Sequence, residues 1–101
     1  MALKIEHRHK LDGDAATTAA EKFALEAQND PQMTKYVNLD WVWRNRGIEM
    51  DLDLKGRVKI KGFLKLEPGR VLVELDLPLL AKPFAGVVKE RVQKALETVF
   101  V

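Results

Sequence analysis

Two histidines, His7 and His9, stand on either side of an arginine near the start of the chain. Such a pair could supply two ligands of a zinc ion or act as a proton relay, because on a strand both rings point to the same side. A useful metal site needs a third protein ligand, and helix capping already accounts for one of the nearest carboxylates, Asp12 and Asp14. We therefore expect no metal, keep His7 and His9 as weak candidates only, and expect both rings to pack against the end of a helix.

The remaining residues offer little catalytic chemistry. The chain contains neither cysteine nor serine, which removes the commonest nucleophiles of covalent hydrolases. Glu49, Asp51 and Asp53 alternate with apolar residues as on the solvent face of a strand, and no phosphate-binding glycine motif leads from a strand into a helix. We expect a protein that is not an enzyme and needs no cofactor; a metal-dependent hydrolase built on His7 and His9 is the least favoured alternative.

Length and composition bound the class of protein. With 101 residues, 47% of them apolar and 32% charged, residues 1–101 form a single globular domain. No apolar run reaches the roughly 20 residues that span a membrane, and no apolar signal core follows the N-terminus, so we expect a cytoplasmic protein. The net charge of +2 does not point to an anionic partner.

Hydrophobic periodicity predicts the elements that position these residues. Alternating residues predict strands, and residues repeating every three to four positions predict helices. Strands are predicted at residues 3–11, 39–44, 48–54, 57–66 and 71–77, and helices at 11–31 and 84–100. Short turns join the last four strands, as in an antiparallel meander. The order β-α-β-β-β-β-α predicts an α+β fold in which both helices pack on one face of an antiparallel sheet.

The other face of the sheet is predicted to be charged. Turns at residues 55–57 and at Pro68-Gly69 place acidic residues of two strands opposite lysines of the strand between them. The predicted pairs are Asp53 with Lys59, Asp51 with Lys61, Lys61 with Asp76, and Phe63 with Glu74. Because the lysines are opposed by carboxylates, we expect no nucleic-acid binding on this face.

Two apolar residues interrupt this charged pattern. Phe63 and Leu72 fall on the charged face as diagonal neighbours, and with Val42 they would form a small apolar patch. Such a patch suits docking on an apolar surface or a homodimer contact, although two ordinary exposed side chains would explain it equally well. Alternatively, Gly62 could mark a bulge that turns the Phe63 ring inward.

A small-molecule pocket is the alternative site. Trp41 and Trp43 share one strand face, where core packing is the commoner role of tryptophan. A curved sheet that grips a long C-terminal helix could instead enclose a pocket beside Trp41, Trp43 and Phe84. This alternative predicts a module that binds small hydrophobic ligands such as acyl or lipid-like compounds.

The linear order of motifs resembles the polyhydroxyalkanoic acid system family of small bacterial proteins. The resemblance rests on "HKL" before an Ala-rich helix, a Trp-bearing strand, "KGFLKLEPGRVLVELDLPLL" and "PFAGVVKERVQKALETVF". The positions that carry it are His9, Leu11, Gly62, Leu77, and either Leu79 or Leu80. The chain departs from it at His7, where arginine is commoner, and in a longer loop around "NDPQMTKYVNLD".

This resemblance implies a role at or near polyhydroxyalkanoate granules, the storage polyester of bacteria, or in their regulation. It brings no catalytic residues. The leading hypothesis is a granule-associated accessory protein that binds the polyester surface or a granule-associated protein through Phe63, Leu72 and Val42. A homodimer through the same face is the other partner that the apolar patch would suit.

Overall fold

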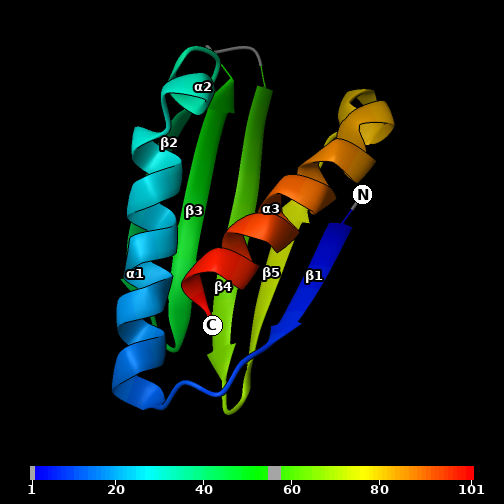
Figure 1. Ribbon diagram of the computed structural model, residues 1–101. Helices are drawn as coiled ribbons and strands as arrows, with labels where there is room; N and C mark the ends of the chain where they lie inside the picture. The colour runs from blue at the N-terminus through cyan, green and yellow to red at the C-terminus, as the bar shows by residue number, and fades with distance from the viewer. Residues whose placement is uncertain (1, 55–57) are drawn as a thin grey trace.

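The computed structural model describes residues 2–54 and 58–101, apart from the side chains of Gln32 and Phe84. Within these residues, five antiparallel strands form one sheet. Helices α1 and α3 lie on the same face of it (Figure 1). The elements are β1 (Ala2–Arg8), α1 (Gly13–Asn29), α2 (Pro31–Thr34), β2 (Asn38–Arg44), β3 (Gly47–Leu54), β4 (Val58–Glu67), β5 (Arg70–Asp76), η1 (Leu79–Phe84) and α3 (Ala85–Val99). The strand order β1-β5-β4-β3-β2 makes β2 to β5 a meander, with β1 added beside β5. The predicted α+β fold is confirmed.

The register of the central strands is the predicted one. The Cα partners include Asp53 with Lys59, Asp51 with Lys61, Lys61 with Asp76, and Phe63 with Glu74. The ladder runs through Gly62 without interruption, with Met50 on one side and Leu75 on the other. The alternative of a bulge at Gly62 is therefore wrong, and Phe63 stays on the face away from the helices. The reversal predicted at residues 55–57 lies outside the described residues.

Helix α1 begins after Asp12, one of the two capping candidates in the sequence, and lies within the predicted range of residues 11–31. Asp12 is the N-cap residue, and its Oδ1 accepts a hydrogen bond from the Ala15 amide at 2.9 Å. Asp30 ends the helix, because the residue before a proline disfavours helical backbone. The short α2, which the sequence did not predict, begins at Pro31, and the Asp30 carbonyl accepts from Met33 and Thr34.

The core lies between the sheet and the two long helices. Alanines of α1 face the sheet, and their small side chains let the helix approach it closely. Helix α3 crosses the other half of the sheet over β1 and β5, and only its C-terminal part is buried (Figure 1). The largest fully buried side chains are Phe100, Ile5, Ile48, Leu64, Leu96, Val71 and Val73. The C-terminal end of α3 is therefore anchored in the core, while its N-terminal turns are only partly buried, with Ala85 and Val88 packed against the core.

Candidate functional site

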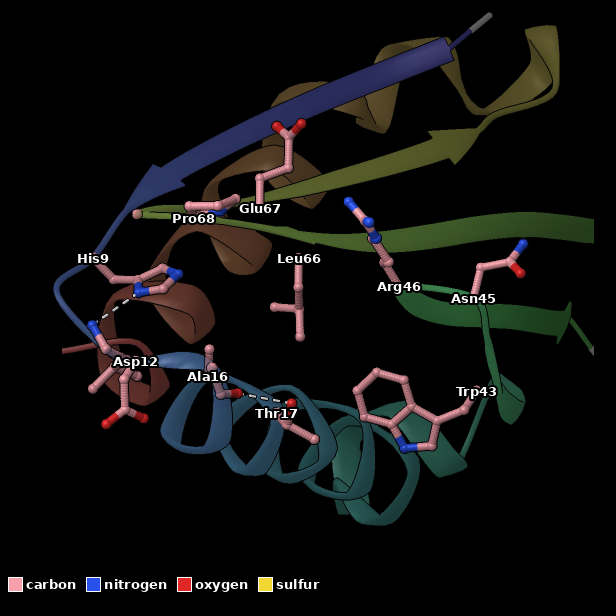
Figure 2. Close-up of a pocket in the computed structure, with 13 residues that line it drawn as sticks. His9, Asp12, Ala16, Thr17, Trp43, Asn45, Arg46, Leu66, Glu67 and Pro68 are labelled. Atoms are coloured by element: carbon pink, nitrogen blue, oxygen red, sulfur yellow. Dashed lines mark hydrogen bonds between the residues drawn. The ribbon is translucent and has the colours of Figure 1, made fainter.

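A cavity of about 720 Å³ opens at one end of the sheet. The turn between β2 and β3, the turn between β4 and β5, and the start of α1 surround it (Figure 2). Its apolar wall consists of Leu11, Ala16, Trp43 and Leu66. Polar side chains stand around this wall, among them His9 and Arg46. The size and the mixed lining are those of small-molecule sites in proteins, which range over several hundred Å³.

His9 forms one wall of this end cavity and is only 8% exposed. Its Nδ1 accepts a hydrogen bond from the Leu11 amide at 3.1 Å, so in the neutral ring the proton is on Nε2. The ring also packs against Phe100, with centroids 5.2 Å apart. Nε2 is buried and has no hydrogen-bond partner within residues 2–54 and 58–101. A buried donor without an acceptor is uncommon, because the unmade hydrogen bond costs about 1–3 kcal/mol.

His7 makes a different contact with the same helix end. Its Nε2 donates a hydrogen bond to the carbonyl oxygen of Phe100 at 2.8 Å. Both imidazoles therefore contact the C-terminal end of α3, as the packing interpretation of the sequence expects. In the described part of the chain, no three His, Cys, Asp or Glu side chains gather closely enough to hold a metal ion.

Arg46 is an exposed residue that lines the end cavity, and Figure 2 shows its side chain on the far side of Leu66 from His9, directed toward β4. A tight turn presents it, and Asn45 adopts the left-handed conformation there with φ 54°. The Leu66 amide donates to the Arg46 carbonyl at 3.0 Å, which ties this turn to β4. The guanidinium takes part in none of the ion pairs among the described side chains. The nearby carboxylate of Glu67 is already paired with Arg70 at 2.6 Å.

The structure separates the three residues of the expected aromatic pocket. Trp43 lines the end cavity, and its Nε1 donates to Glu21 of α1 at 2.9 Å. Trp41 is half-buried against the core farther along β2, and its Nε1 donates to Gln28 at 3.3 Å. The side chain of Phe84 lies outside the described residues, and η1 is at the opposite end of the sheet from the cavity (Figure 1). Of the two tryptophans, Trp43 alone lines this cavity.

The outer face of the sheet carries the expected apolar residues, but they do not form one patch. Phe63 and Leu72 are diagonal neighbours, and both are half-buried. Glu49 lies between Val42 and Phe63 in the cross-strand row, and it forms an ion pair with Arg44 at 3.0 Å. Further ion pairs surround them: Lys4–Glu74, Lys61–Asp51, Lys65–Glu67 and Arg70–Glu6. The outer face is thus largely a network of paired charges.

The most exposed leucines lie elsewhere, in η1. Leu79 and Leu80 are 78% and 85% exposed, and Val87 in the first turns of α3 is 56% exposed. We call these three residues the leucine tip. Figure 1 shows η1 and the start of α3 extending past the ends of β5 and β1. Two leucines between Pro78 and Pro83 are the signal in the sequence for this exposed apolar segment.

A scan against protein families matches residues 3–100 to the model of polyhydroxyalkanoic acid system proteins. The chain belongs to this family. The match covers nearly the whole chain, so the sheet, both helices, the end cavity and the leucine tip all lie within the family region. No curated protein matches the chain. Among the described helices, none is long and apolar enough to cross a membrane.

Proposed function

We propose that this chain is a non-catalytic accessory protein of the polyhydroxyalkanoate system, and that it docks on the surface of the storage-polyester granule through the leucine tip. The observation that carries the proposal is the exposure of Leu79 and Leu80 on a projecting segment. Leaving two leucines in water costs free energy that burial in an apolar phase would recover. The family supplies the polyester context in which such a phase exists.

The shape and charge of the leucine tip favour a granule surface over a protein partner. Single apolar side chains on a projecting segment suit insertion into a deformable apolar phase, whereas a homodimer contact needs a broad complementary face. Residues 78–91 carry three basic side chains and one acidic one, and Lys82 and Lys89 are exposed. These lysines would stay at the water boundary and attract anionic groups of the granule coat.

The outer face is the less suitable docking surface. Its two central apolar residues, Phe63 and Leu72, are half-buried, and paired charges surround them. Docking there would remove these charges from water, which costs more than the small apolar area returns. Val42, which is 47% exposed, is the outer-face residue best placed for a direct comparison with the tip.

Co-sedimentation with purified amorphous polyhydroxyalkanoate granules tests the proposal. The unaltered chain should sediment with the granules, and the retained fraction should persist at high salt because the contact is apolar. Replacing both Leu79 and Leu80 by Asp should weaken binding by about a hundredfold or more, since each buried leucine contributes about 1.5 kcal/mol or more. Leu25→Asp, at a leucine that is 46% exposed on α1, serves as the matched control and should bind normally.

Two outcomes would contradict this docking mode. If Val42→Asp removed sedimentation while the double tip variant retained it, the outer face would be the docking surface. If the unaltered chain eluted as a dimer, the tip variant as a monomer, and neither sedimented with granules, the leucine tip would be a contact between two copies of the chain. Circular dichroism of each variant shows that the fold is retained.

A further inference from the structure

The end cavity contains a hydrogen-bond donor that the fold leaves unused. The His9 ring is held from two sides, by the Leu11 amide on Nδ1 and by the Phe100 ring. These contacts fix the direction of Nε2, and Figure 2 shows the ring with its second nitrogen turned toward Leu66 and the cavity. With no acceptor in the described part of the chain, this N–H group would gain a hydrogen bond from any ligand oxygen that reached the inner wall.

A second unused donor stands across the cavity. The Arg46 guanidinium takes part in no ion pair among residues 2–54 and 58–101, and its planar fork suits a carboxylate. The carboxylates that also line the cavity already have partners. Asp12 caps α1 through the Ala15 amide, and Glu67 is paired with Arg70 and Lys65. The charge available to an incoming ligand is therefore the positive charge of Arg46.

The surface between these two donors is apolar. Figure 2 shows the Leu66 side chain between His9 and Arg46, with Trp43 and Ala16 lining the rest of the wall. A matching ligand therefore has a carboxylate at one end, a short aliphatic segment, and a second oxygen farther along the chain. A simple fatty acid has the carboxylate but lacks the second oxygen.

We infer that the end cavity binds the carboxyl end of a short linear oligomer of hydroxyalkanoic acid. The terminal carboxylate pairs with Arg46, an inner ester or hydroxyl oxygen accepts from Nε2 of His9, and the aliphatic segment lies on Leu66 and Trp43. This choice of ligand rests on the proposed function, because the polyester is what supplies such chains. The volume of about 720 Å³ accommodates an oligomer of a few units rather than the polymer.

Tryptophan emission can report on this binding directly. Trp43 lines the cavity and Trp41 does not, so a Trp41→Phe chain leaves one reporter at the site. The probe is the linear trimer of 3-hydroxybutyric acid, and its titration should give a saturable change in Trp43 emission. The methyl ester of the trimer and a saturated fatty acid of similar length should each bind about tenfold or more weakly, because the ester lacks the charge that pairs with Arg46 and the fatty acid lacks the inner oxygen that accepts from His9. Absence of saturable binding by the trimer would overturn the inference, as would equal binding of all three compounds.

Two variants assign the contacts. Arg46→Gln should weaken binding of the trimer about tenfold and leave binding of its methyl ester unchanged. Arg44→Gln is the matched control, since Arg44 is two residues away on the outer face and pairs with Glu49. His9→Phe keeps an aromatic ring beside Phe100 but removes the donor, and it should reduce the preference for the trimer over the fatty acid. If Arg46→Gln behaved like Arg44→Gln, the site would not be the one inferred.

Granule docking through the leucine tip and oligomer binding in the end cavity can be tested independently of each other. Arg46→Gln should sediment with granules like the unaltered chain, and the double tip variant should bind the trimer normally. Trimer binding without granule sedimentation would remove the docking proposal alone. Granule sedimentation without trimer binding would remove the cavity ligand alone.

Discussion

The ring of Phe63 lies over Gly47, across the outer face of β3 and β4. A Cβ placed on Gly47 would be 2.9 Å from Cζ of that ring and 2.1 Å from the carbonyl oxygen of Leu64. Because Gly47 has no side chain, the Phe63 ring can occupy the space above it. An aromatic ring that covers a glycine in this way stabilises the strand that contains the glycine. The half-buried state of Phe63 is explained by this contact within the sheet, which is why we do not place the docking surface there.

Replacing Gly47 by alanine should destabilise the protein by about 2 kcal/mol or more, because the Leu64 backbone cannot move away as easily as a flexible side chain. Urea unfolding followed by circular dichroism measures the change. Gly86→Ala is the control, since a Cβ there meets no atom within 4 Å, and in helix α3 it should stabilise by about 0.5–1 kcal/mol. Equal effects of both substitutions would show that the Phe63–Gly47 contact has no special role.

Two aspartates at the start of α1, Asp12 and Asp14, should differ in their contribution to stability. Asp12→Ala removes the side chain that accepts from the Ala15 amide and should cost about 1 kcal/mol of stability. Asp14→Ala alters a carboxylate in the first turn that caps nothing, so its cost should be a few tenths of a kcal/mol. Thermal unfolding of the two variants side by side measures the difference. A larger loss for Asp14→Ala would contradict the assignment of Asp12 as the cap.

The histidine pair should not form a zinc site. Among the described residues, no group of three His, Cys, Asp or Glu side chains could hold a metal ion. A metal on Nε2 of His9 would also place the ring proton on Nδ1, which would break the hydrogen bond from the Leu11 amide. Titration with cobalt(II) should show no protein-dependent absorption bands of a tetrahedral site. A tight one-to-one complex that disappears in His7→Ala would overturn this expectation.

Local rules account for much of the fold. The register of β3, β4 and β5 could be predicted because each turn is short and a slip of one residue would move every apolar side chain to the wrong face. Asp12 and Asp30 likewise mark the ends of α1 through chemistry that is local in sequence. The placement of β1 beside β5 depends instead on contacts between residues about seventy positions apart, which periodicity does not contain.

The candidate sites were harder to predict, because they depend on contacts between distant segments. The end cavity is lined by His9, Trp43, Arg46 and Leu66 from three segments far apart in the sequence, and no local motif joins these segments. The sequence shows Phe63 as an aromatic residue on a charged strand face. Its contact with Gly47 could not be predicted in the same way, because the two residues are diagonal neighbours on the paired strands β3 and β4. The exposure of Leu79 and Leu80 depends on how far α3 extends beyond the sheet, which periodicity does not determine.

The most direct test of granule docking uses the absence of cysteine from the chain. A single cysteine placed at Leu80 or, in a second variant, at Val42 can be labelled with one environment-sensitive fluorophore. On addition of polyhydroxyalkanoate granules, the label at position 80 should shift to shorter emission wavelength as it leaves water, and the label at position 42 should not change. A shift at position 42 with none at position 80 would contradict docking through the leucine tip.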